Sequence, residues 1–165
     1  MTAPSAAAPR PTGRGSRVWR FLLRVMYRGL RMIDPLIRSW RANALAGLDG
    51  VVEVSIVGRT SGKPRTNLVT LLGVGDEWYI GHPNGETAWT RNAEAAGVVR
   101  IDPPSAHGSE FSVVRLPQGA ERDSVIAATR AQQPFPANLV YRAATRHISD
   151  VGVYFRLVPV TKGPA

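Results

Sequence analysis

Residues 58–65, Gly-Arg-Thr-Ser-Gly-Lys-Pro-Arg, place three cations, two hydroxyl side chains and two glycines close together. Glycines let backbone N–H groups turn toward a ligand, while Arg and Lys neutralise negative charge and Ser and Thr add neutral donors. Such a group is suited to hold a phosphorylated or carboxylated cofactor. The same residue types are also ordinary in a hairpin turn, and composition alone leaves the two interpretations level.

Two apolar segments, Val51–Val57 and Leu68–Val74, flank this loop, which ends at Asn67. Because a strand pattern and not a helix follows, the glycine spacing does not fit a Walker-type phosphate loop. After residue 49, two helices are predicted, over residues 87–96 and 120–131. Six strands are predicted, rich in Val, Leu, Ile and aromatic residues: Val51–Val57, Thr66–Val74, Glu77–Gly81, Val98–Asp102, Glu110–Leu116 and Val151–Pro159.

Strands joined by hairpins, without regular βαβ alternation, predict an antiparallel barrel in an α+β protein that is mainly β. Other chemistry is scarce in this sequence. The three histidines lie far apart without metal-ligand spacing, and cysteine is absent, so no metal site is predicted. Ser61 lacks a nucleophile-elbow context, and no paired carboxylates are evident. An enzyme of this sequence would rely on the chemistry of a bound cofactor.

The net charge of +9 is concentrated near the N-terminus. Residues 1–48 contain nine Arg and a single acid, whereas residues 49–165 contain twelve Lys or Arg and eleven acids. The near balance after residue 49 argues against a nucleic-acid-binding face on the globular part. We therefore predict three regions: a disordered tail at residues 1–16, a basic helical segment at 17–48, and one cofactor-binding domain at 49–165.

Arginines at positions 17, 20, 24, 28 and 31 fall within an arc of roughly 80° on a helical wheel, and apolar residues cover most of the remainder. The segment is too interrupted by charge for a spanning helix or a signal peptide. Residues 17–33 either lie on an anionic membrane surface or pack on the domain or on a second subunit. We expect a cytoplasmic protein, peripheral to the inner face of the cell membrane.

The order of the motifs resembles the deazaflavin-dependent nitroreductase family, split β-barrel proteins of actinobacteria that use coenzyme F-420. The resemblance rests on residues 57–68, the Gly75-Asp76 hairpin and the run Ala88-Trp89-Thr90-Arg91-Asn92, and covers roughly Val51–Pro159. Some members share the basic amphipathic N-terminal helix and its membrane association. Two barrels that share a groove are normal for this architecture, so the resemblance is compatible with a homodimer, while the sequence leaves the oligomeric state open.

The resemblance implies several cofactor contacts. The anion-binding loop would hold the phosphate and the oligoglutamate tail, Asn67 would reach the deazaflavin or its ribityl chain, and the segment at residues 81–85 would lie beneath the ring. Trp89 and Asn92, three residues apart on one helix face, would close the groove. The cofactor-binding residues so implied are Arg59, Ser61, Lys63, Arg65, Asn67, His82, Pro83, Asn84, Gly85, Trp89 and Asn92.

The implied reaction is hydride transfer from reduced F-420 to a quinone-like, nitroaromatic or other conjugated apolar acceptor. Tyr141 is the candidate catalytic hydroxyl and substrate contact, and Phe135 is the candidate apolar wall. The loop Pro83-Asn84-Gly85-Glu86 is shorter than in many relatives, His82 stands where a small residue is usual, and Thr90 replaces their Tyr. An FMN-dependent reductase on the same barrel and a non-catalytic protein that binds a cofactor or lipid at the membrane surface stay open as alternatives.

Overall fold

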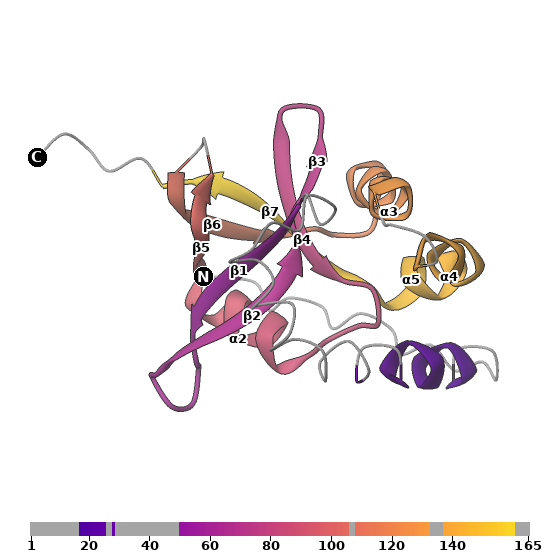
Figure 1. Ribbon diagram of the computed structural model, residues 1–165, viewed down its shortest axis with the longest axis horizontal. Helices are drawn as coiled ribbons and strands as arrows, with labels where there is room; N and C mark the ends of the chain where they lie inside the picture. Colours follow the sequence, from indigo (N-terminus) through magenta and orange to yellow (C-terminus); the bar gives the residue numbers. More distant parts are fainter. Residues whose placement is uncertain (1–16, 26–27, 29–49, 106–107, 133–136, 161–165) are drawn as a thin grey trace, which may run out of the picture.

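The computed structural model describes residues 17–25, 28, 50–105, 108–132 and 137–160 (Figure 1). Its strands are β1 (Val51–Val57), β2 (Pro64–Thr70), β3 (Leu72–Val74), β4 (Glu77–His82), β5 (Val98–Ser105), β6 (Gly108–Arg115) and β7 (Val153–Pro159). Its helices are α2 (Ala88–Ala96), α3 (Ala120–Gln132), α4 (Ala137–Ala143) and α5 (Thr145–Val151), preceded by an N-terminal helix at residues 17–25.

The strands form one sheet in the order β2-β1-β5-β6-β7-β4-β3, and each neighbouring pair is antiparallel. The two edge strands, β2 and β3, are consecutive in the sequence and are separated by Leu71 alone. Because one residue spans at most about 3.5 Å, the two edges must meet there, and the sheet curls into a half-barrel. The predicted α+β class with an antiparallel split β-barrel is confirmed.

The predicted strand Thr66–Val74 is two strands in the structure, which raises the count in the described residues from six to seven. Up to Thr70 the chain pairs with β1, and from Leu72 it pairs with β4. Between them, Leu71 N–H donates to the Gly50 carbonyl at 2.6 Å. The break therefore comes from a change of partner strand at the barrel corner, which local sequence does not mark.

Side chains on the two faces of β4 and β7 enter two different apolar clusters, since successive residues of a strand point to opposite faces. The barrel cluster lies on the face that carries Phe155. Its members are Val54, Ile56, Val69, Ile80, Ala93, Val99, Ile101, Phe111, Val153, Phe155 and Leu157. The helix-side cluster lies on the face that carries Tyr154. Its members are Leu23, Leu72, Tyr79, Leu116, Val125, Ile126, Tyr141, Ala144, Ile148 and Tyr154.

The helices divide between these clusters. Helix α2 supplies Ala93 to the barrel cluster and lies close to the β1–β2 hairpin, whereas α3, α4 and α5 group on the opposite side of the molecule (Figure 1). The N-cap residue of α2 is Thr87, whose hydroxyl accepts from Thr90 N–H while the Thr90 hydroxyl accepts from Thr87 N–H. This capping box fixes the start of the helix. The start of α2 therefore agrees with the predicted helix at residues 87–96.

Candidate functional site

The loop between β1 and β2 is a closed hairpin. Gly58 N–H donates to the Lys63 carbonyl at 2.9 Å, and Gly62 N–H donates to the Gly58 carbonyl at 2.8 Å. A Cβ atom on Gly58 would lie 2.8 Å from Ser61 Oγ, and Gly62 has a φ of 64°. Gly58 is favoured because a larger side chain would collide with Ser61. Gly62 is favoured because its positive φ is a backbone conformation that other residues rarely adopt.

This hairpin and the strand that follows it carry three exposed cations, Arg59, Lys63 and Arg65, and are called the cationic hairpin below. Within the described part of the chain, none of the three forms an ion pair with a carboxylate. Arg65 pairs in register with Ile56 on the neighbouring strand, and Asn67 pairs with Val54. Paired residues share a face, so Arg65 and Asn67 lie on the face of the sheet that carries the barrel cluster.

The hairpin is attached to helix α2 through Arg59. The Asn92 side-chain oxygen accepts from Arg59 Nη1 at 2.9 Å and from Arg59 N–H at 3.4 Å. On the same helix, the Trp89 ring lies 6.4 Å from Phe155 and 6.5 Å from His82, measured between ring centroids. The structure thus brings together two of the residues proposed for the cofactor, Arg59 and Asn92, and places Trp89 against the barrel cluster.

The segment after β4 is engaged within the protein. His82 Nδ1 accepts from Asn84 N–H at 3.3 Å, and burial lowers the pKa of His82 to about 4. The imidazole is therefore neutral at physiological pH. Asn84 donates its side-chain N–H to the Arg20 carbonyl at 3.2 Å, and its oxygen lies 2.9 Å from His147 Nε2. Pro83, which lies between His82 and Asn84 in the sequence, and Gly85, which follows Asn84, are both buried. Gly85 has a φ of 86°.

Arg115 forms ion pairs near the start of α2 that the sequence did not predict. Its guanidinium binds Glu94 of α2 at 2.7 Å and Glu86 of the preceding loop at 3.1 Å. The pairs join residues 21 and 29 positions apart. No short-range spacing could have revealed them. Arg115 ties the loop before α2 to the helix itself and helps to hold α2 beside the barrel.

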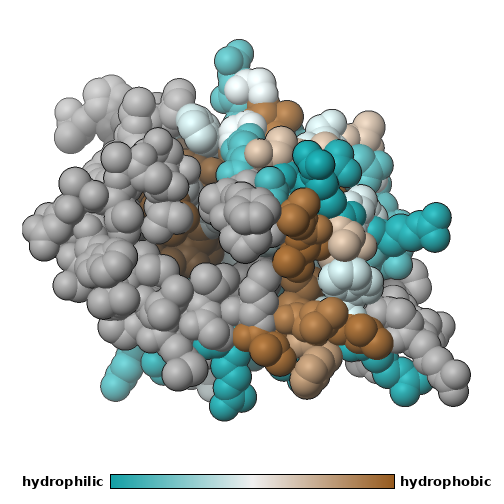
Figure 2. Space-filling view, turned by 45° about the vertical axis from the view of Figure 1, so that its right-hand side comes forward, coloured by the Kyte–Doolittle hydropathy of each residue, from teal (hydrophilic) through white to brown (hydrophobic). Residues whose placement is uncertain are grey.

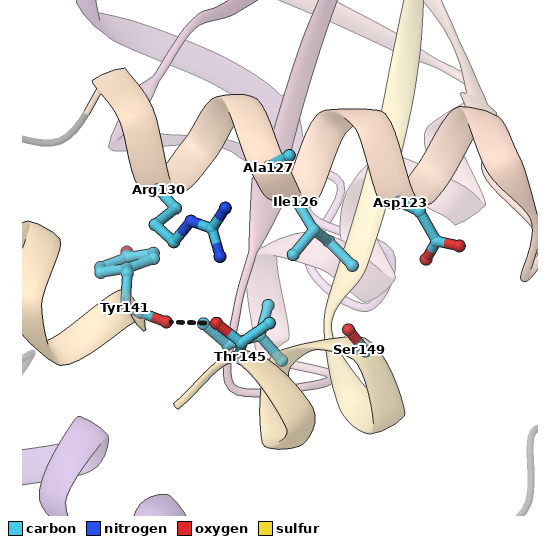
Figure 3. Close-up of a pocket in the computed structure, with 8 residues that line it drawn as sticks. Asp123, Ile126, Ala127, Arg130, Tyr141, Thr145 and Ser149 are labelled. Atoms are coloured by element: carbon cyan, nitrogen blue, oxygen red, sulfur yellow. Dashed lines mark hydrogen bonds between the residues drawn. The ribbon is translucent and has the colours of Figure 1, made fainter. Parts of the chain in front are cut away.

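Tyr141 lies in a different part of the molecule from the cationic hairpin. It belongs to the helix-side cluster and lines a pocket of about 310 Å³ between α3, α4 and α5. In Figure 3, Arg130 and Asp123 lie at opposite ends of this pocket, and Thr145 donates to the Tyr141 carbonyl. A catalytic role for Tyr141 stays a prediction, and Phe135 lies outside the described residues.

No group of three or more His, Asp or Glu side chains that could hold a metal ion occurs among the residues that the structure describes.

No protein-family model matches this sequence, and no curated protein matches it either. Solved structures resemble it distantly. A conserved hypothetical protein of Mycobacterium tuberculosis gives a TM-score of 0.50 at 10% identity, over 78% of this chain and 81% of the other. The heme storage protein HutZ of Vibrio cholerae gives 0.49 at 14% identity, over 78% and 91%. An F-420 reductase gives 0.41 at 18% identity, over 68% and 87%. At such identities the likeness is one of fold alone.

Proposed function

We propose that this protein is an oxidoreductase that binds coenzyme F-420 and catalyses hydride transfer from its reduced form to a conjugated apolar acceptor such as a quinone or a nitroaromatic. The observation that carries the proposal is the cationic hairpin. Arg59, Lys63 and Arg65 are exposed and without carboxylate partners in the described residues, and the Arg59–Asn92 contact joins the hairpin to α2.

The chemistry of these donors fits the anionic part of F-420. Its phosphate and oligoglutamate tail carry several negative charges, which guanidinium and ammonium groups can bind at an exposed site without a shape-specific pocket. Arg59 uses its backbone N–H and Nη1 for Asn92, which leaves the other N–H groups of the guanidinium available to a ligand. Arg65 and Asn67 extend the same polar row along β2, on the face of the sheet that carries the barrel cluster.

The deazaflavin, when bound, supplies the hydride, and the protein binds, orients and shields it. Trp89 offers an aromatic wall beside the barrel cluster, and the Arg59–Asn92 bond fixes the distance between the hairpin and α2. Proton donation by Tyr141 is a separate part of the proposal, because it requires the acceptor to reach the α3–α5 side. Tyr141→Phe tests that part through kcat, with the dissociation constant for F-420 as the internal reference.

Calorimetric titration with F-420 and FMN in parallel tests the function, followed by mixing of the reduced cofactor with menadione. We expect F-420 to bind and menadione to be reduced. Binding of FMN alone would replace F-420 with a flavin, and F-420 binding without turnover of any acceptor would favour a non-catalytic binding protein.

Arg65→Ala tests the assignment of the tail. It should weaken F-420 binding about ten-fold and leave a deazaflavin without the tail nearly unaffected. Arg142→Ala is the matched control, because Arg142 is an exposed arginine on α4, on the other side of the molecule. An equal loss for both cofactors would show that the hairpin does not hold the tail.

A further inference from the structure

The N-terminal helix is attached to the domain along one side. Leu23 is completely buried in the helix-side cluster, and Trp19 packs against the same cluster. The Arg20 carbonyl accepts the side-chain N–H of Asn84 at 3.2 Å. These contacts lie within an arc of about 100° on the helix. They fix how the helix is rotated about its own axis, and therefore which side chains face away from the domain.

The side chains that face away are apolar. Val18, Phe21, Leu22 and Val25 are 58%, 64%, 47% and 52% exposed. At 100° per residue the four also fall within an arc of about 100°, so they form one continuous strip. In Figure 2, hydrophobic surface gathers at the foot of this face of the molecule, with hydrophilic groups on either side. A strip of this kind indicates a contact surface, unlike single exposed apolar residues.

A row of arginines borders the apolar strip. Arg17, Arg24 and Arg28 are exposed, and in the described part of the chain none of them pairs with a carboxylate. On the helix at residues 17–25, Arg17 and Arg24 fall within an arc of about 20° that lies next to Phe21 on the wheel, and Arg28 follows three residues beyond the end of that stretch. The helix therefore carries three parallel strips: one packed on the domain, one cationic and one apolar and exposed.

We propose that the outward side of this helix docks the protein on an anionic lipid bilayer. Phe21, Leu22 and Val25 would enter the boundary between headgroups and acyl chains, while the arginine row binds lipid phosphates. The charge selects this occupant, because a row of exposed arginines beside an apolar strip complements an anionic interface, whereas a second copy would set the same cations against each other. In the described residues, no helix is long and apolar enough to cross a membrane.

The packed strip gives the docked state a defined orientation. Leu23 and Trp19 pack on the domain, and Asn84 donates to the Arg20 carbonyl, so the helix is fixed relative to the barrel. A protein docked through this helix would therefore have one defined orientation on the lipid surface. The proposal does not rest on the cofactor, since none of the residues in the apolar strip or the arginine row belongs to the cationic hairpin.

Vesicle flotation of the full chain tests the proposal, with phosphatidylcholine alone compared with an equal mixture of phosphatidylcholine and phosphatidylglycerol. We expect flotation with the anionic vesicles only. Phe21→Ser and Leu22→Ser should each lower the partition coefficient about ten-fold, and Arg24→Gln should lower it about five-fold. Val158→Ser is the matched control, because this valine is 41% exposed on β7. It should float like the wild type.

Absence of flotation by the wild type, or unchanged flotation of both serine variants, would overturn the proposal. So would a dimer in sedimentation that dissociates on Phe21→Ser while flotation is unaffected, since the strip would then be an interface between copies. A loss of flotation in all three helix variants, with thermal unfolding equal to that of the wild type and the control unchanged, would support lipid docking and exclude misfolding as the cause.

Discussion

The two apolar clusters on either face of β4 and β7 differ in what surrounds them. The barrel cluster is enclosed by strands and α2, and the cationic hairpin stands at its edge through the Arg59–Asn92 bond. The helix-side cluster is covered by four helices, among them the N-terminal helix with its outward apolar strip. One side of the molecule thus carries the exposed cations Arg59, Lys63 and Arg65, and the other carries exposed apolar side chains on the N-terminal helix, with Tyr141 on the second side.

The largest expected change in the free energy of unfolding comes from a substitution in the barrel cluster. Phe155 is completely buried, and its ring lies 6.4 Å from that of Trp89. Phe155→Ala should lower the free energy of unfolding by about 4 kcal/mol, since it removes a large apolar side chain and leaves a cavity. Urea denaturation followed by circular dichroism measures the change. On the same strand, Val158→Ala should cost less than about 0.5 kcal/mol; equal losses would mean that this cluster is not the core.

The second effect tests how firmly the N-terminal helix belongs to the helix-side cluster. Leu23→Ala should lower the free energy of unfolding by about 3 kcal/mol, because Leu23 is completely buried. Its neighbour Leu22 is 47% exposed, and Leu22→Ala should cost less than about 0.5 kcal/mol. Denaturation of both variants under the same conditions gives the comparison. Similar small losses would show that the helix does not pack on the domain in solution.

The third expected effect is on the pH dependence of stability, because the barrel side contains the half-buried His82 and the helix side contains the buried His147. Burial lowers the pKa of His82 to about 4 from an unfolded value of 6.5. As pH falls, the unfolded chain therefore binds the proton first, and stability is lost between pH 6.5 and about 4. At pH 5 this loss amounts to about 2 kcal/mol. On the other side, burial and then Arg20 also lower the pKa of His147, which adds a loss of the same sign.

His82→Asn isolates the contribution of the barrel side, since the Asn oxygen can accept from Asn84 N–H in place of Nδ1. The free energy of unfolding at pH 7 and pH 5 is compared between wild type and variant. The variant should lose about 2 kcal/mol less than the wild type over this interval, with the His147 contribution retained in both. An identical pH dependence would contradict the assignment of a neutral imidazole with a lowered pKa at position 82.

The sequence alone predicted those elements that carry local signals. Apolar runs marked the strands, and Gly75, with a φ of 59°, forms the predicted turn between β3 and β4. Thr87 marked the start of α2. Helices α4 and α5 were not predicted, because each has only seven residues and the N-cap residue of α5, Ala144, provides no side-chain cap. Without periodicity over several turns or a capping residue, such helices depend on tertiary packing.

The sequence indicated which residue types make up the candidate site, but it could not indicate which of those residues contact each other. The run from Gly58 to Arg65 indicated an anion-binding loop, and the order of Trp89 and Asn92 suggested a common groove. The contact between Arg59 and Asn92 spans 33 positions, and that between Asn84 and His147 spans 63. Only the fold decides such pairs. For the same reason, the sequence could not reveal that Tyr141 enters the helix-side cluster while Trp89 packs against the barrel cluster.

The smallest expected effect concerns the bond that places the cationic hairpin at the edge of the barrel cluster. Arg59→Ala and Asn92→Ala should each lower the free energy of unfolding by less than about 1 kcal/mol, because both groups lie near solvent. The double variant should reveal a coupling of about 0.5 kcal/mol between them. Strictly additive losses would mean that the bond is not formed in solution. The same cycle measured on the dissociation constant for F-420 should give a larger coupling than stability does, because the bond fixes the position of the hairpin cations while the fold rests on the two apolar clusters.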